Sequence, residues 1–143
     1  VGIGQLEKID LFNQKRTDLV KHYFKLLTTP EAQKFGLGLP LANFTDTNWH
    51  MFQVLLPYKN LSVKRAEVMA KMHEAGIGTG VHYPVIHLFS LYRSFGWKAG
   101  DFPCAEEAGS NLLTLPLFAT MTNTEVERVV KALLAILSDH FRS

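Results

Sequence analysis

The chain has 143 residues and a formal net charge of +2, from 15 lysines and arginines against 13 acidic residues. Hydrophobic residues make up 47% and charged residues 20%, close to the average of globular domains. This composition excludes a disordered tail, a collagen-like chain and a disulfide scaffold. The near-neutral charge, without a basic run, gives no reason to expect nucleic acid as a partner.

One cysteine, Cys104, has no partner for a disulfide within the chain, which favours a reducing compartment and a cytoplasmic location. No apolar stretch approaches the roughly 18 residues that a membrane span needs, so we expect no membrane partner. The chain begins at Val1 without a methionine, and helix-like sequence follows at once. Two origins fit this start: a trimmed purification tag, or excision from a longer protein.

The first predicted element is a long amphipathic helix from Ile3 to Leu27. Its apolar residues recur at intervals of three and four, and charged residues occupy the other faces. Pro30 ends the helix because proline cannot continue the hydrogen-bond ladder. The segment from Pro30 to Asn48 is punctuated by glycine, proline and asparagine and is predicted to be a loop.

Three short segments are predicted to be strands. Trp49–Pro57 is aromatic and apolar and ends in a proline, which is typical of a buried strand. Ile77–Pro84 carries glycine at alternate positions, a pattern that indicates close approach of another backbone. Leu112–Leu117 is the third predicted strand.

Four further helices are predicted between and after these strands. One is capped by Ser62 and ends at Gly76. A short helix spans Ile86–Phe95, and another spans Cys104–Asn111, with a proline near its first turn.

The last helix spans Asn123–Phe141, and Thr122 with Glu125 forms its capping box. The whole chain, residues 1–143, is therefore predicted to be a single α+β domain. Its small, mainly antiparallel three-stranded sheet has helices on one face. The long N-terminal helix is left over and is expected to pack against something outside this chain.

The segment from His82 to His87 is the strongest candidate for a functional site. It places two imidazoles and the phenol of Tyr83 where a glycine-rich strand meets a proline turn. Histidine titrates near neutral pH and can donate to phosphate or carboxylate, and loops after strands often carry binding groups. Both histidines also fit a structural role near the core, and the residues alone leave the choice open. His50, beside Trp49, fits either a ligand pocket or simple packing.

Other chemistry finds little support in the sequence. His82 and His87 are five residues apart across a proline, which is not the spacing of a zinc-binding helix, and there is no cysteine pair. Cys104 has no nucleophile motif around it, so a small hydrolase is disfavoured. The glycines between positions 76 and 80 do not form a phosphate loop, because no lysine followed by serine or threonine comes after them.

Five stretches resemble the DegT/DnrJ/EryC1/StrS family of sugar aminotransferases, in the right order along the chain. Gly76–Leu88, GIGTGVHYPVIHL, is similar to the family signature GIGTGVHYPPLHL. Gly100–Glu106 resembles GDFPVAE, and Leu113–Thr122 resembles LSLPLFPGMT. Trp49–Phe52 and Gly4–Asp10 are similar to the family's WHLF strand and to the start of its interdomain helix.

The resemblance implies the C-terminal small domain of a fold-type I aminotransferase, in an enzyme two to three times this length. The large domain, with the lysine that binds pyridoxal phosphate, is then absent from this chain, so the fragment is expected to be inactive alone and to hold no cofactor. The parent enzyme is expected to transfer an amino group from an amino acid, usually glutamate, to a keto group of a nucleotide-linked sugar, for surface polysaccharide such as lipopolysaccharide or for deoxysugars. Its expected partners are its own large domain and a second subunit in a homodimer.

By the same resemblance, His82 and Tyr83 face the sugar-nucleotide side of the cleft, and His87 and His50 are weaker candidates for substrate contacts. Two alternatives stay open. Some relatives are sugar dehydratases with histidine in place of the cofactor lysine, and that position is not in this chain. A free-standing ligand-binding or interaction module of the same fold is the other alternative.

Overall fold

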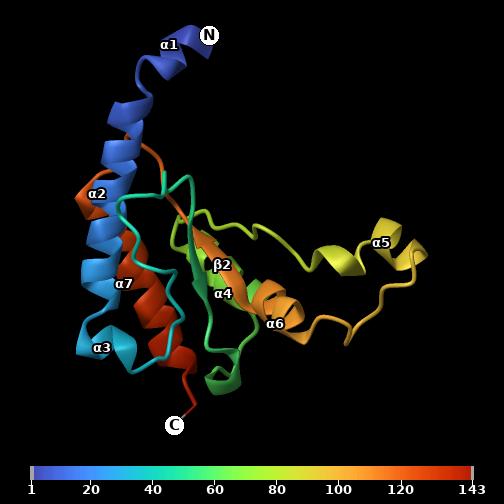
Figure 1. Cartoon of the computed structure of the whole chain (residues 1–143). Coiled ribbons are helices and arrows are strands. Elements are labelled where there is room, and N and C mark those ends of the chain that lie inside the picture. The colour runs from blue at the N-terminus through green and yellow to red at the C-terminus, as the bar shows by residue number, and fades with distance from the viewer. Residues whose placement is uncertain (1, 143) are drawn as a thin grey trace.

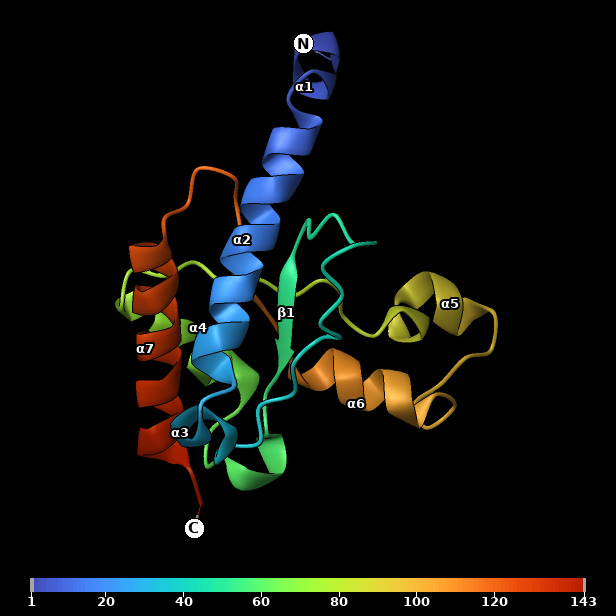
Figure 2. The ribbon, with the colours of Figure 1, turned by 60° about the vertical axis from the view of Figure 1, so that its left-hand side comes forward.

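The computed structural model describes residues 2–142 of the chain. Two long helices, α2 and α7, pack side by side, and a two-stranded sheet lies next to them (Figures 1 and 2). A smaller set of helices, α5 and α6, lies on the far side of the sheet from α2 and α7. The elements are α1 (Gly2–Leu6), α2 (Ile9–Leu27), α3 (Pro30–Gln33), β1 (Phe52–Leu55), η1 (Tyr58–Asn60), α4 (Arg65–Glu74), η2 (Ile86–Leu88), α5 (Ser90–Ser94), α6 (Pro103–Asn111), β2 (Leu112–Leu115) and α7 (Asn123–His140).

The sheet pairs β1 with β2 in antiparallel fashion, with Phe52 opposite Leu115 and Val54 opposite Leu113. These four side chains are buried, because residues two apart on a strand share a face. The other face carries the opposed pair Gln53 and Thr114. The register of one strand pair therefore assigns the core residues and the outward residues at the same time.

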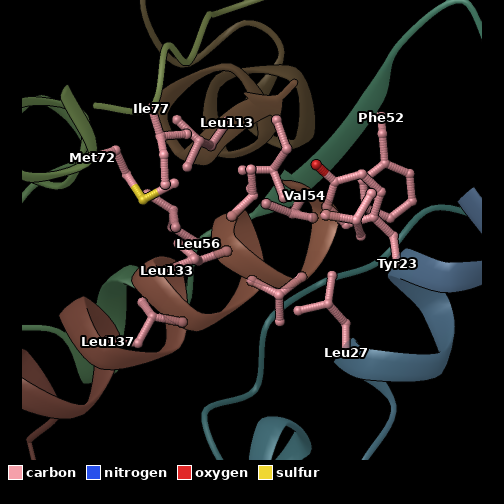
Figure 3. Packing of buried hydrophobic residues seen from close by; sticks show 14 of the residues in the cluster. Tyr23, Leu27, Phe52, Val54, Leu56, Met72, Ile77, Leu113, Leu133 and Leu137 are labelled. Atoms are coloured by element: carbon pink, nitrogen blue, oxygen red, sulfur yellow. The ribbon is translucent and has the colours of Figure 1, made fainter. Parts of the chain in front are cut away.

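The hydrophobic core lies between the inward face of the sheet and helices α2, α4 and α7 (Figure 3). Tyr23 of α2 stacks on Phe52, with ring centroids 4.7 Å apart, and its buried hydroxyl donates to the Pro116 carbonyl at 2.8 Å. Burial raises the pKa of the Tyr23 phenol well above its ordinary value, so this hydroxyl stays a hydrogen-bond donor. Met72 of α4 and Leu133 of α7 fill the other end of the same cluster.

The predicted three-stranded sheet is wrong, because the described residues form two strands and the predicted strand Ile77–Pro84 does not form. Within residues 77–84 the structure places only Gly80 in the ladder, as a single bridge to Thr114 with N···O distances of 3.0 and 2.8 Å. Ile77 instead closes the end of α4 by donating to the Met72 carbonyl, and Pro84 has no N–H to offer. These ends leave too little extended chain for a strand.

The predicted continuous helix from Ile3 to Leu27 is interrupted. Residues 7 and 8 lie between α1 and α2, and α1 buries none of its side chains. A five-residue helix with two glycines and no packing surface has little to stabilise it. The exposed apolar side chains Ile3, Leu6 and Ile9 do confirm the expected solvent-facing apolar surface at this end of the chain.

The remaining helices depart from the sequence predictions at three places. One of them is α3 (Pro30–Gln33), which forms at the start of the segment that was predicted to be a loop; its N-cap is Thr29, and its proline occupies the first turn. Ser62 does not begin α4, because Lys64 is the N-cap residue and the Ser62 hydroxyl donates to the His140 carbonyl at 3.2 Å. Gly76 ends that helix with a φ of 71°, a conformation that glycine adopts without strain. Residues 86–95 form the short elements η2 and α5 in place of one helix.

The capping box at the start of α7 is present as predicted, and it gives the first test. The Thr122 hydroxyl accepts from the Glu125 N–H at 3.3 Å, and the Thr122 N–H donates to the Glu125 carboxylate at 2.7 Å. We expect Thr122→Ala to lower the free energy of unfolding by about 1 kcal/mol, because a cap is lost. Chemical denaturation measures this, with Thr124→Ala, an exposed threonine inside the same helix, as the control. Equal losses in the two variants would contradict the assignment.

Candidate functional site

His82 lies against the outward face of the sheet and is held at two of its atoms. Its ring nitrogen Nδ1 is 3.0 Å from the Thr114 hydroxyl, and its main-chain carbonyl accepts a hydrogen bond from the Gln53 side-chain amide. Gln53 and Thr114 face each other across the two strands. The side chain of His82 is exposed, and no described residue bonds its other ring nitrogen, Nε2. The ring is thus fixed on one edge and open on the other.

Gly80 makes room for this ring. A Cβ atom at Gly80 would lie 2.8 Å from Cε1 of His82 and 3.3 Å from its Nδ1. Real Cβ atoms do not approach that closely, so a side chain at position 80 would displace the imidazole from Thr114. The glycine pattern predicts close approach of another backbone, but the group that lies against Gly80 is the imidazole of His82, and a Cβ at Gly78 would meet nothing within 4 Å.

Tyr83 begins a segment, residues 83–102, that extends away from α2 and α7 and carries α5 (Figures 1 and 2). We call this segment the aromatic arm. Tyr83 itself is 62% exposed, and its ring meets that of His82 edge to face at 5.4 Å. The arm's exposed apolar side chains are Tyr83, Ile86, Phe89, Leu91, Tyr92, Phe95, Trp97 and Phe102.

A shallow, largely apolar groove runs between the aromatic arm and α6. It begins at Tyr83, includes Trp97 and Phe102, and reaches Ala108 and Gly109 of α6. Gly109 is packed closely, since a Cβ there would lie 2.6 Å from a methyl group of Val85. The groove therefore starts beside the exposed imidazole of His82.

His87 lies near the start of the arm, and one of its ring nitrogens already contacts a carboxylate. Its Nε2 is 3.1 Å from Oε1 of Glu106, and its side chain is only 11% exposed. The same carboxylate oxygen accepts from the main-chain N–H groups of Gly100 at 2.8 Å and Phe102 at 3.4 Å. We call this set of contacts the Glu106 clasp, and it ties both ends of the aromatic arm to α6.

The Glu106 clasp also sets the charge state of its carboxyl group. The hydrogen bond from the Gly100 N–H is the largest cause that lowers the pKa of Glu106 below its ordinary value, and His87 adds to it. The carboxylate form is thus favoured by folding. Sequence reasoning missed Glu106, although its place in the first turn of a helix that starts with a proline was a signal that it could accept main-chain N–H groups.

His50 sits apart from these contacts. It lies on the bend before β1, exposed, and its main-chain N–H donates to the Asn48 side chain at 3.2 Å. The neighbouring Trp49 is buried in the core and packs near Phe24 and Phe52. The structure thus brings His82 and Tyr83 together, and within residues 2–142 no hydrogen bond joins either of them to His50 or His87.

Two other kinds of site find no support in residues 2–142. No group of three histidine, cysteine or acidic side chains is arranged to hold a metal ion. No helix in this part of the chain is long and apolar enough to cross a membrane.

Comparison with known proteins decides the family. The model of the DegT/DnrJ/EryC1/StrS aminotransferase family matches residues 1–134. The chain belongs to this family. The resemblance seen in the five sequence stretches is therefore confirmed, and the match extends through most of α7.

One relative by sequence and two solved structures match nearly all of this chain. The protein MJ1066 of Methanocaldococcus jannaschii is 32% identical over 142 residues, which are 98% of this chain and 36% of the relative. DesV of S. venezuelae, solved with a ketimine intermediate, is 30% identical with a TM-score of 0.78, over 93% of this chain and 34% of DesV. Spr1654 of Streptococcus pneumoniae, named as a candidate sugar aminotransferase and solved in its PLP form, is 22% identical with a TM-score of 0.83, over 96% and 34%. The chain thus spans about a third of the length of these family members.

The lysines of this chain do not fit a site for pyridoxal phosphate. A lysine that binds this cofactor covalently needs a desolvated position with a lowered pKa. Every lysine here is exposed except Lys71, which is half-buried on α4, and the one resolved lysine shift, at Lys59, raises the pKa, chiefly through the charge of Tyr58. None of the described lysines therefore has the desolvated environment that a covalent link to the cofactor needs.

The Glu106 clasp gives the second test, by hydrogen exchange at the Gly100 amide. We expect Glu106→Gln to lower the protection of this amide roughly threefold to tenfold, because a charged acceptor becomes neutral. Because the pKa of Glu106 is lowered on folding, the stabilisation is present above the ordinary glutamate pKa and is lost as the pH falls through the folded value. Protection in the unaltered chain should fall accordingly in acid.

Glu107→Gln is the matched control for this test. Glu107 accepts from the Tyr58 hydroxyl at 3.3 Å and pairs with Lys59 at 3.7 Å, and within residues 2–142 no hydrogen bond or ion pair joins it to the arm. Equal protection at Gly100 in the Glu106 and Glu107 variants would contradict the clasp.

Proposed function

We propose that this chain is the C-terminal small domain of an aminotransferase that transfers an amino group from an amino acid, glutamate, to a keto group of a nucleotide-linked sugar. The family match over residues 1–134 carries the proposal. Its product would enter surface polysaccharide or deoxysugar synthesis, in the cytoplasm. Pyridoxal phosphate, held by the rest of the enzyme, would supply the electron sink for the reaction.

In this proposal the chain forms the substrate side of the cleft. The exposed Nε2 edge of His82 would hydrogen-bond an oxygen of the substrate, such as one of its diphosphate group. Tyr83, exposed beside it, offers a phenol hydroxyl and an apolar ring. His50 and His87 are the weaker members of the proposed set of substrate contacts. His50 is exposed but bonds neither His82 nor Tyr83, and for His87 only Nδ1 is free of a hydrogen bond within the described residues.

The proposed partners are the large domain of the same enzyme and a second subunit. Two separate apolar surfaces support this: the exposed residues of α1 and the first turn of α2, and the aromatic arm. They lie at different ends of the molecule (Figure 1). Contiguous exposed apolar patches usually mark an interface, and two such patches fit two different partners.

A variant of His82 tests the proposed substrate contact. The assay uses the protein encoded by the longest reading frame that contains this chain. In that enzyme we expect His82→Ala to raise KM for the nucleotide sugar roughly tenfold, which is the effect of a lost hydrogen bond to a charged group. The half-reaction with glutamate should keep its rate. The control is His73→Ala, an exposed histidine on α4. No change for the sugar, or equal changes in both half-reactions, would refute the assignment of His82.

Cofactor binding by the isolated chain also tests the proposed function. We expect equilibrium dialysis with pyridoxal phosphate to show no stoichiometric binding, because no lysine here lies in a desolvated pocket. The chain should likewise show no transfer of an amino group from glutamate. Tight one-to-one binding of the cofactor would overturn the division of roles that we propose.

A further inference from the structure

The cross-strand pair Gln53 and Thr114 makes contacts that are unusual for two outward-facing residues of a small sheet. Both side chains bond the same residue, His82, one at its ring and one at its carbonyl. Thr114 also pairs with Gly80 through both of its main-chain groups. Position 114 thus fixes the backbone two residues before His82 and also fixes the His82 ring.

The burial of Thr114 determines the direction of its hydrogen bond to His82. The residue is 8% exposed, and within residues 2–142 its hydroxyl has no hydrogen-bond partner besides Nδ1 of His82. If Nδ1 carried the proton, the ring would donate to the hydroxyl oxygen, and the hydroxyl hydrogen would be left without an acceptor in a buried position. Such a group costs free energy. The hydroxyl therefore donates to Nδ1, and in the neutral ring the proton resides on Nε2.

We propose that Thr114 and Gln53 are positioning residues that hold His82 in its Nε2–H tautomer, so that the open edge of the ring presents a hydrogen-bond donor. A donor at this edge selects an oxygen of a phosphate or carbonyl group and rejects a ligand that itself donates there. Gln53 fixes the main chain of the same residue, which limits rotation of the ring away from the sheet. The choice of ligand rests on the proposed function. The assignment of the tautomer does not depend on it.

Gly80 belongs to the same arrangement. The imidazole that bonds Thr114 occupies the space that a side chain at position 80 would need, since a Cβ there would be 2.8 Å from Cε1. Gln53 and Thr114 come from the two strands, whereas Gly80 lies two residues before His82, so the orientation of the ring depends on the folded sheet as well as on the local sequence.

Nitrogen-15 NMR of the histidine rings in the 143-residue chain tests the tautomer directly. The chain has six histidines, and His82→Ala identifies the signals of His82 by their loss. Above the titration range of the ring, we expect an unprotonated Nδ1 and a protonated Nε2. Thr114→Ser should keep this state, because it retains the hydroxyl, whereas Thr114→Val should give a mixture of tautomers with averaged shifts.

The outcomes of the NMR test are distinct. A protonated Nδ1 in the unaltered chain, or an unchanged tautomer in Thr114→Val, would overturn the proposal. Denaturation curves of the serine and valine variants confirm that each is folded, and Gln53→Met is a further variant that leaves the hydroxyl in place. It should keep the Nε2–H state and broaden the ring signals.

Kinetics of the enzyme in the longest reading frame separates this inference from the proposed function. We expect Thr114→Val to raise KM for the nucleotide sugar roughly twofold to tenfold, with Thr114→Ser close to the unaltered enzyme. If NMR shows the expected tautomer while His82→Ala leaves that KM unchanged, the proposed substrate contact fails and the positioning of the ring stands. If His82→Ala raises KM but the tautomer is wrong, the positioning role fails and the substrate contact stands.

Discussion

The antiparallel pairing of β1 with β2 is the constraint on which the rest of this structure depends. Opposed side chains share a face, so one register buries Phe52, Val54, Leu113 and Leu115 and leaves the other face to Gln53 and Thr114. A slip of one residue would exchange the two sets and expose the core. The packing of α2, α4 and α7 therefore stabilises the same register that holds His82, which links the hydrophobic core to the candidate site.

The aromatic arm is attached to this body by few contacts. The Glu106 clasp ties both ends of the arm to α6, and Val85 packs closely on Gly109. Beyond these points its aromatic side chains are exposed, including Phe95 at 69%. A domain with a complete core seldom leaves so much apolar surface on one short segment unless another surface covers it. The same reasoning applies to α1. The described residues therefore form one packed core and leave two apolar patches exposed.

Helices with strong local signals were predictable from the sequence, and features that depend on distant residues were not. Periodicity and capping chemistry gave α6 and α7 to within a residue or two. The predicted strand Ile77–Pro84 failed because glycine spacing indicates close approach but not how many residues pair, and within that segment only Gly80 pairs, with Thr114. Ser62 failed as a cap because its hydroxyl bonds His140, which is 78 positions away in the sequence.

The candidate site was predictable in part, for the same reason. The residues of the His82–His87 segment stood out by their chemistry, but Gln53 and Thr114 did not. Each is an ordinary polar residue in an apolar stretch, and only the strand register places them opposite each other. Glu106 acquires its role from the loop that folds back onto it, with three hydrogen bonds to one oxygen.

The contacts of the two histidines argue for different roles, a choice that the residues alone left open. His87 is nearly buried and its Nε2 lies 3.1 Å from the Glu106 carboxylate, so this contact serves to hold the arm. His82 is exposed and its partners are a hydroxyl and an amide, neither of which carries charge. Neither partner carries a charge that would offset the charge of a bound ligand, and neither forms a hydrogen bond with Nε2. Of the two rings, His82 is the one whose free edge is suited to a ligand oxygen, and the fold directs its other edge into the sheet to keep it so.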